Sequence, residues 1–347
     1  MKSTVLCGLL MIGLVSSAGA QLKDRFKDCF RIGAALNQAQ FDERDTRGAD
    51  IVKAQFNTIS PENVLKWESV HPKPDGYTFE QADRYVAFGE KNDMFVIGHT
   101  LVWHSQTPRW VFEDDKGAPL SREALLERMR GHIQTVVGRY KGRIKGWDVV
   151  NEALNEDGTF RQSPWFKIIG EEFIAKAFGF AHEADPDAEL YYNDYSLEND
   201  AKRNGAIALI KKLQEQGIPV TAVGLQGHDK MESPTIEQQA AAIEAFSRLG
   251  IKVNITELDI DVLPAKLNPY PDGLPDSVQQ ALARRYADLF GVFVKDCGVV
   301  SRVTFWGVTD GDSWLNNWPV RGRTAYPLLF DRNGQPKPAF NAVVGVK

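Results

Sequence analysis

The sequence lacks the features of a membrane protein, a nucleic-acid-binding protein or a disulfide-rich scaffold. It has three cysteines in 347 residues, and no apolar run reaches the roughly 20 residues that a membrane-spanning helix needs. The formal net charge is −5 and the basic residues are not clustered, which argues against a nucleic acid or an anionic membrane as partner. With 43% apolar and 25% charged residues, the composition is that of an ordinary globular protein.

Three catalytic motifs are also absent. No Gly-rich turn follows the first expected strand, as dinucleotide binding would require. No His-x-His or His-Glu-x-x-His sequence occurs, and His99 and His104 are poorly spaced for metal ligands, so we expect no metal and no other cofactor. A Gly-x-Ser-x-Gly turn, which would indicate a nucleophilic serine, is missing as well.

The first 20 residues have the pattern of an export signal. Lys2 gives a positive start, Val5–Val15 is a short apolar run, and Ala18-Gly19-Ala20 fits a cleavage site. Cleavage there leaves residues 21–347, which we expect to be a secreted or periplasmic protein without membrane attachment. The alternative is that these first residues form a core helix.

Strand-like and helical segments alternate eight times along the rest of the chain. The expected strands cover residues 28–36, 56–60, 95–100, 144–151, 189–193, 221–225, 251–256 and 299–306. The expected helices end at 55 and cover 76–92, 121–140, 165–184, 200–216, 236–249, 277–294 and 337–344. Such alternation predicts parallel strands, and eight repeats predict an α/β protein with one closed (β/α)₈ TIM-barrel domain. An open doubly wound sheet is the alternative.

Barrel closure has a consequence for the two cysteines that remain after export. Cys29 begins the first expected strand, and Cys297 directly precedes the eighth. These strands are neighbours in a closed barrel, so both cysteines would lie at its amino-terminal face. An exported chain can form disulfides, and we take a Cys29–Cys297 bond as a hypothesis. Two separate buried thiols are the alternative.

Polar residues collect at the carboxyl ends of the expected strands, where the active sites of such barrels lie. The fourth strand ends in Asn151-Glu152 and the seventh in Glu257-Leu258-Asp259. Three of the 6 histidines and four of the 8 tryptophans also fall at strand ends, which core packing does not explain. Amides, acids and imidazoles suit hydroxyl-rich ligands, and indoles suit sugar faces. Two carboxylates flanking one bond are the apparatus of glycoside hydrolysis.

From about Phe30 to Val344 the chain resembles glycoside hydrolase family 10, the retaining endo-β-1,4-xylanases. The motifs that carry the resemblance are SPENVLKW (60–67), GHTLVWHSQTP (98–108), WDVVNEAL (147–154), YYNDYS (191–196), GLQGH (224–228), ITELDI (255–260) and TFWGVTDGDSW (304–314). The resemblance implies that Glu152 is the general acid/base and Glu257 the nucleophile. It also implies that His228 and Asp259 orient the nucleophile.

The same resemblance implies a set of substrate-binding residues. Asn151 would hold the sugar 2-hydroxyl next to the reacting centre, and Tyr195 is a candidate platform for the leaving group. The other binding residues implied are Glu62, Asn63, Lys66, His99, Trp103, Gln106, Gln226, His228, Trp306 and Trp314. The implied substrates are β-1,4-xylan and xylo-oligosaccharides, and we expect a monomer.

Two other functions stay open. The same machinery could act on another β-glycan, with mixed or β-1,3 linkages. A non-catalytic glycan-binding barrel is the alternative of a different class, and it predicts damage at one of the two acids, whereas Glu152 and Glu257 are both present. The Pro-rich segment 262–276 after the seventh strand has no assigned role in either reading.

Overall fold

The computed structural model of the chain describes residues 21–264 and 266–347. The predicted export signal, residues 1–20, lies outside this part. Within it, no helix is long and apolar enough to cross a membrane.

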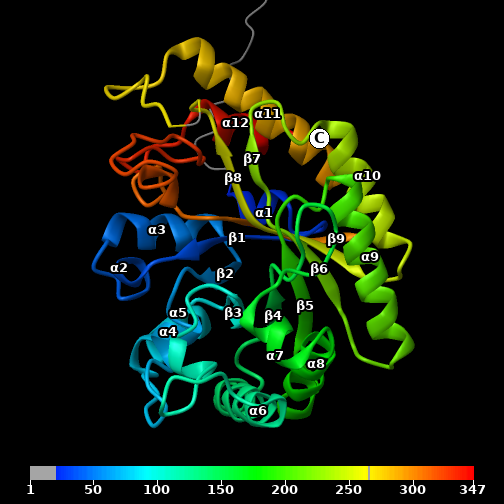
Figure 1. Ribbon diagram of the computed structural model, residues 1–347. Coiled ribbons are helices and arrows are strands. Elements are labelled where there is room, and N and C mark those ends of the chain that lie inside the picture. Colours follow the sequence, from blue (N-terminus) through cyan, green and yellow to red (C-terminus); the bar gives the residue numbers. More distant parts are fainter. Residues whose placement is uncertain (1–20, 265) are drawn as a thin grey trace, which may run out of the picture.

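Eight parallel strands close into a barrel (Figure 1). In order around the barrel they are β1 (Arg31–Leu36), β2 (Thr58–Pro61), β3 (Phe95–Val102), β4 (Gly146–Asn151), β5 (Glu189–Asp194), β6 (Ala222–Leu225), β8 (Lys252–Asp261) and β9 (Val300–Phe305). The barrel closes where β9 pairs with β1. A short additional strand, β7 (His228–Lys230), pairs with the carboxyl-terminal end of β8. The predicted (β/α)₈ barrel is therefore confirmed, and the open sheet is excluded.

Helices lie around the outside of the barrel (Figure 1). They are α1 (Leu22–Arg25), α2 (Gln38–Phe41), α3 (Thr46–Gln55), α4 (Trp67–Val70), α5 (Glu80–Lys91), α6 (Arg122–Arg139), α7 (Pro164–Ile169), α8 (Glu172–Ala184), α9 (Asp200–Glu215), α10 (Ile236–Ser247), α11 (Asp276–Lys295) and α12 (Pro338–Val344), with two 3₁₀ turns at Arg109–Val111 and Trp314–Asn316. Ser121 caps α6, because its hydroxyl accepts a hydrogen bond from the amide of Ala124.

One expected element is wrong. The segment 165–184 is not one helix, because it breaks between α7 and α8 at Gly170. Gly170 has φ of 85°, a left-handed conformation that ends a helix and that glycine adopts without steric cost. Its amide still bonds to the carbonyl of Phe166 at 2.8 Å. Apolar residues continue on both sides of the break, and so hydrophobic periodicity alone did not reveal it.

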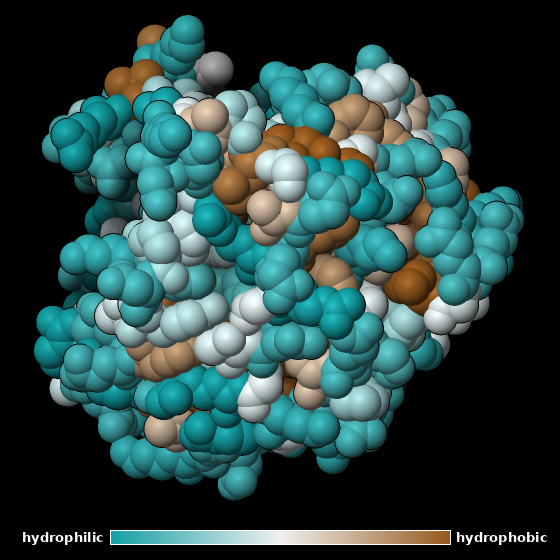
Figure 2. Space-filling view, turned by 60° about the horizontal axis from the view of Figure 1, so that its bottom comes forward, coloured by the Kyte–Doolittle hydropathy of each residue, from teal (hydrophilic) through white to brown (hydrophobic). Residues whose placement is uncertain are grey.

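Burial explains why the strands read as continuous apolar runs. Every residue of β2 and of β4 is buried, because helices cover one face of each strand and barrel side chains cover the other. The helices are amphipathic instead. In α5 the buried residues include Ala82, Tyr85, Val86 and Gly89, at the spacing of one helical face. The outer surface in Figure 2 is mainly hydrophilic, with small separated hydrophobic patches.

A disulfide joins Cys29 and Cys297, which are 268 residues apart in the sequence. Cys29 lies just before β1 and Cys297 just before β9, the two strands that meet at the barrel closure. The bond therefore ties the closure at the amino-terminal face, opposite the polar strand ends.

We expect the double variant Cys29→Ser/Cys297→Ser to lose about 2–4 kcal/mol of unfolding free energy, because a crosslink over a long loop restricts the unfolded chain. Its turnover per folded molecule should not change, since the bond lies at the other face of the barrel. Urea denaturation and activity assays measure the two effects. For the native protein lacking residues 1–20, thiol titration in denaturant should give no free thiol without reductant and two with it. Equal counts would contradict the disulfide.

Candidate active site

A cleft of about 1130 Å³ lies at the carboxyl ends of the barrel strands. All of the residues predicted to contact substrate line it, namely Glu62, Asn63, Lys66, His99, Trp103, Gln106, Asn151, Glu152, Gln226, His228, Glu257, Trp306 and Trp314. Tyr195 also lines the cleft. Asp259 lies behind His228 and does not line it. The structure thus brings together residues from seven separate sequence motifs.

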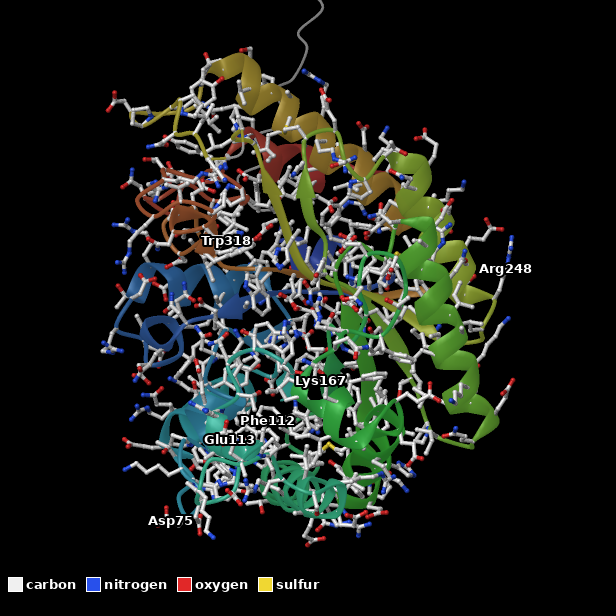
Figure 3. All side chains as sticks on the ribbon, viewed as in Figure 1. Asp75, Phe112, Glu113, Lys167, Arg248 and Trp318 are labelled. Atoms are coloured by element: carbon white, nitrogen blue, oxygen red, sulfur yellow. A yellow bond between two sulfur atoms is a disulfide. The ribbon has the colours of Figure 1, made fainter. Side chains whose placement is uncertain are left out.

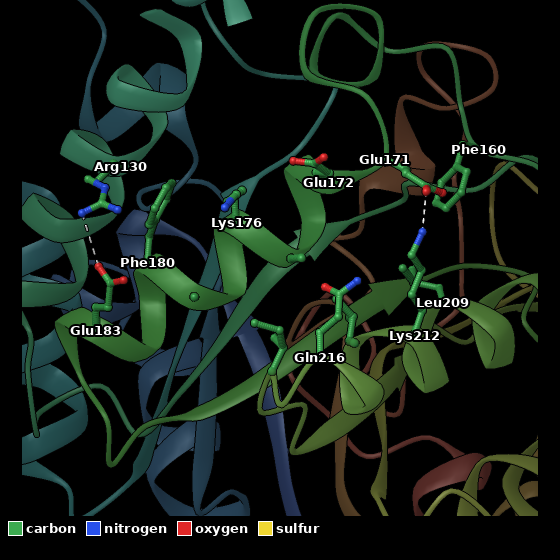
Figure 4. Close-up of a pocket in the computed structure, with 14 residues that line it drawn as sticks. Arg130, Phe160, Glu171, Glu172, Lys176, Phe180, Glu183, Leu209, Lys212 and Gln216 are labelled. Atoms are coloured by element: carbon green, nitrogen blue, oxygen red, sulfur yellow. Dashed lines mark hydrogen bonds and ion pairs between the residues drawn. The ribbon is translucent and has the colours of Figure 1, made fainter. Parts of the chain in front are cut away.

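A second, smaller cavity of about 550 Å³ lies between the outer helices, mainly α8 and α9 (Figure 4). It shares no lining residue with the cleft. Four of its charged residues form ion pairs with one another, Arg130 with Glu183 at 3.6 Å and Lys212 with Glu171. The paired carboxylates at the strand ends are absent from it, so the chemistry belongs to the larger cleft.

Glu152 follows β4 and has an unusual backbone conformation. Its φ is 57°, which is strained for a residue other than glycine and occurs mostly where function requires it. Its amide bonds to the carbonyl of Asn193 at 2.9 Å, which fixes the turn. The side chain is 14% exposed, and Oε1 accepts hydrogen bonds from Gln226 Nε2 at 3.1 Å and from Asn151 Nδ2 at 3.3 Å.

His104 is the ionisable group next to Glu152. Its Nδ1 lies 4.0 Å from Glu152 Oε2. Burial lowers the pKa of His104 below its ordinary value, although the charge of Glu152 opposes this effect. A neutral imidazole at neutral pH adds no positive charge beside Glu152. The carboxyl oxygens of Glu152 therefore contact two amides and lie near a neutral ring, while the Arg161 guanidinium binds the backbone carbonyl of Glu152 at 2.9 Å.

Glu257 lies in β8 and, unlike the carboxyl group of Glu152, contacts a charged side chain. Its side chain is buried, Oε1 accepts a hydrogen bond from Asn193 Nδ2 at 2.8 Å, and Oε2 lies 3.2 Å from His228 Nε2. Burial by itself raises the pKa of this carboxyl. The hydrogen bond from His228, the electrostatic effects of His99 and His228, and the bond from Asn193 together outweigh burial and lower the pKa of Glu257. Glu257 is therefore ionised at neutral pH.

His228 is held between two carboxylates. Its Nδ1 lies 3.0 Å from Asp259 Oδ1, and its Nε2 faces Glu257. Burial alone would lower the pKa of His228, but Asp259 and then Glu257 raise it well above the ordinary value. Both ring nitrogens of the resulting imidazolium donate hydrogen bonds. The pairing of β7 with β8 sets this contact, because it places His228 opposite Asp259.

Three amides join the two carboxylates. Asn151 Oδ1 accepts hydrogen bonds from Asn193 Nδ2 at 2.8 Å and from Gln226 Nε2 at 3.4 Å. The same two amides bond to Glu257 and Glu152, respectively. Asn193 Oδ1 in turn accepts from the hydroxyl of Thr256 at 2.6 Å. Asn193 stands at the end of the expected strand 189–193, where sequence patterns assigned it no role, and the structure makes it a direct partner of Glu257.

One wall of the cleft is a set of hydrogen-bonding groups around Lys66. Its Nζ donates to Asn63 Oδ1 at 3.0 Å and to Gln106 Oε1 at 2.8 Å, and it lies 5.1 Å from the ring centre of Trp103. Burial lowers the pKa of Lys66 and raises that of Glu62. Held together beside an indole, these groups suit a ligand rich in hydroxyls.

Tyr195 lies in another part of the cleft lining, where two cations hold it. Arg161 Nη2 donates to the Tyr195 hydroxyl at 2.8 Å, and Lys202 Nζ lies 3.4 Å from the ring centre. Lys202 is fully buried and pairs with Asp194 at 3.0 Å, and burial raises the pKa of Asp194 to about 6. Sequence reasoning missed Arg161 and Lys202, because neither lies at a strand end.

The described residues include no group of three or more His, Cys, Asp or Glu side chains placed to hold a metal ion. The ionised Glu257 and the amide-bound Glu152 are the candidate reacting groups. An ionised acid and a second acid that is hydrogen-bonded to amides can supply a nucleophile and a proton donor to one bond.

Comparison with known proteins gives matches over nearly the whole chain. The endo-1,4-beta-xylanase A of Xylanibacter ruminicola is 44% identical, covering 99% of this chain and 98% of the relative. The beta-1,4-xylanase of Dictyoglomus thermophilum is 45% identical, covering 93% of this chain and 90% of the relative.

Solved structures agree with the sequence matches. A GH10 endoxylanase from a sugarcane soil metagenome is 46% identical with a TM-score of 0.91, covering 93% of this chain and 98% of that chain. A mutant structure in complex with xylotriose is 37% identical with a TM-score of 0.89, covering 94% and 99%. The model of the family described as "Glycosyl hydrolase family 10" matches residues 21–346, and this chain therefore belongs to glycosyl hydrolase family 10.

Proposed function

We propose that Glu257 is the nucleophile and Glu152 the general acid/base for hydrolysis of xylan. The chain is an endo-1,4-β-xylanase, a retaining glycoside hydrolase of family 10. The unequal surroundings of the two acids are the observation that supports this division of roles. Glu257 bonds to an imidazolium and an amide, whereas Glu152 bonds to two amides near a neutral imidazole.

In the first step, the ionised Glu257 attacks the anomeric carbon and forms a covalent glycosyl ester. The bond to the leaving sugar breaks, and Glu152 transfers its proton to the departing oxygen. His228 and Asn193 orient the attacking carboxylate through their contacts with its two oxygens.

In the second step, water releases the sugar from the ester. Glu152 gave up its proton in the first step, so it can now accept a proton from the attacking water. The hydroxyl that forms takes the same face as the original bond, and Glu257 leaves as a carboxylate. Two displacements at one carbon give net retention of the β configuration.

The other cleft residues support binding of a xylan chain. The oxygen of Asn151 is occupied by Asn193 and Gln226, which directs its NH₂ group towards Glu152 and the reacting centre, where a sugar 2-hydroxyl would lie. The proposed glycone contacts are Glu62, Asn63, Lys66, His99, Trp103, Gln106, Gln226, His228, Trp306 and Trp314, all lining the cleft. Tyr195 is proposed for the leaving-group side.

We also propose that residues 1–20 are removed on export and that residues 21–347 act as one catalytic domain outside the cytoplasm. The export-signal pattern supports this, the family match begins at residue 21, and disulfides persist mainly in oxidising compartments.

Hydrolysis of β-1,4-xylan, with soluble cellulose as the comparison, tests the function. We expect new reducing ends from xylan, much slower release from cellulose, and first products in the β-anomeric form. Proton NMR of the early products identifies the anomer. The α-anomer would remove Glu257 from the role of nucleophile, and no release from xylan would overturn the substrate assignment.

Variants of the two acids separate their roles. Glu257→Ala should lower turnover of every substrate by at least about 10³-fold, since no group then attacks the anomeric carbon. Glu152→Ala should lower turnover of xylan similarly, but it should still form the glycosyl-enzyme from a dinitrophenyl xylobioside, whose leaving group needs no proton. Glu80→Ala, which removes an acid whose side chain is 79% exposed, is the control. Near-native xylan hydrolysis by Glu257→Ala would refute the assignment.

Asp259→Asn should shift the acid limb of the pH–rate profile. The pKa of Glu257 is below its ordinary value, so activity is lost only as pH falls through this lowered pKa. Loss of the Asp259 charge lowers the pKa of His228, and a neutral His228 lets the pKa of Glu257 rise. The acid limb of kcat/KM should move up by about one pH unit, while Asp288→Asn on the exposed face of α11 should not move it. If the acid limb did not move in Asp259→Asn, Asp259 would not control the pKa of Glu257 through His228.

A further inference from the structure

Trp318 is an exposed indole at the rim of the cleft. Its residue is 60% exposed, and among the described residues the exposed large hydrophobic side chains are Leu267, Trp318 and Val320. Of these three, only Trp318 lines the cleft. Figure 3 places it on the loop between β9 and α12. With more than half of its surface in water, its ring contributes little to the core.

The Trp318 indole continues an aromatic surface that begins beside His228 and Asp259. Trp314 Nε1 donates to Asp259 Oδ2 at 2.7 Å, and the Trp314 ring lies 5.0 Å from that of His228. Trp318 lies nearly parallel to Trp314, with 20° between the planes and 6.4 Å between the ring centres. The two indoles therefore extend from the reacting centre towards the edge of the cleft.

A buried cation fixes the loop that carries Trp318. Arg323, whose side chain is 1% exposed, donates from Nη1 to the carbonyl of Trp318 at 2.8 Å. Its Nη2 bonds to both carboxylate oxygens of Asp261, each at 3.1 Å, at the end of β8. Its Nε bonds to the carbonyl of Leu267 in the Pro-rich loop at 3.3 Å. The exposed indole thus has a fixed backbone support attached to the strand that carries Glu257.

We propose that Trp318 is a stacking platform for a further xylosyl unit of the substrate chain, beyond the units held at the reacting centre. A flat apolar ring held at the rim of a polar cleft suits the face of a pyranose, and aromatic faces supply such contact area at small conformational cost. The Pro-rich segment after β8 acquires a role as well, because Arg323 joins it to the support of this platform. This inference rests on the proposed xylanase function and extends it to substrate length.

The test compares a short and a long substrate. Nitrophenyl β-xylobioside supplies two xylosyl units, and xylohexaose supplies enough to reach the rim. For Trp318→Ala we expect kcat/KM on the xylobioside within about twofold of the native value, and a loss of about tenfold on xylohexaose, which corresponds to about 1.4 kcal/mol of transition-state binding. Trp318→Phe should recover most of that loss, because it restores an aromatic face.

Val320→Ala is the matched control, since Val320 is 40% exposed on the same loop and does not line the cleft. It should leave both substrates unaffected. Equal losses on both substrates in Trp318→Ala would show that the indole only supports Trp314, and an unchanged rate on xylohexaose would show that it binds no sugar; either result overturns the proposal. Failure of the native protein to cleave either substrate would instead overturn the proposed function itself.

Discussion

The contact between His228 and Glu257 is the interaction on which the rest of the site depends. A buried carboxylate is costly unless it is paired and hydrogen-bonded, and Glu257 is buried at the centre of the barrel mouth. His228 can pair with it only while charged, and it is charged because Asp259 faces its other nitrogen. Asp259 also accepts the indole N–H of Trp314. One acid behind the cleft therefore orients both the indole of Trp314 and, through His228, the proposed nucleophile Glu257.

The barrel explains why these groups meet. Parallel strands place all their carboxyl ends at one mouth, so Glu152 after β4 and Glu257 in β8 face the same space although 105 residues separate their numbers. The short strand β7 adds His228 at the required register. Asn193 of β5 then links Asn151 to Glu257 across the mouth. The disulfide closes the opposite end, where it stabilises the barrel without entering the chemistry.

Buried ion pairs hold the walls of the cleft in the same way as they hold its floor. Lys202 pairs with Asp194 beneath Tyr195, and Arg323 pairs with Asp261 behind the Trp318 loop. Such pairs contribute little net stability, but removing one partner leaves a buried charge alone, which is strongly destabilising. Their effect here is positional. They keep aromatic rings at fixed places on the walls and rim, where a flexible polysaccharide must be aligned with the two carboxylates.

The sequence by itself determined the barrel and predicted the two acids. Eight alternations of strand and helix imply parallel strands. Polar residues at the strand ends are conspicuous, because the buried remainder of each strand is apolar. Pairing of the first and eighth strands, and with it the closeness of Cys29 and Cys297, also followed from topology alone. Specific motifs then marked Glu152 and Glu257.

Only the tertiary structure decided which groups touch. The role of Asn193, the support of Tyr195 by Arg161 and Lys202, and the attachment of the Trp318 loop by Arg323 depend on side chains from distant repeats, whose relative positions no local pattern records. The sequence pattern did not predict the break at Gly170, because helical periodicity continues across it. Hydrophobic patterns in the sequence indicate how each segment is buried. The contacts between segments depend on strand register and side-chain direction, which are set only once the barrel has closed.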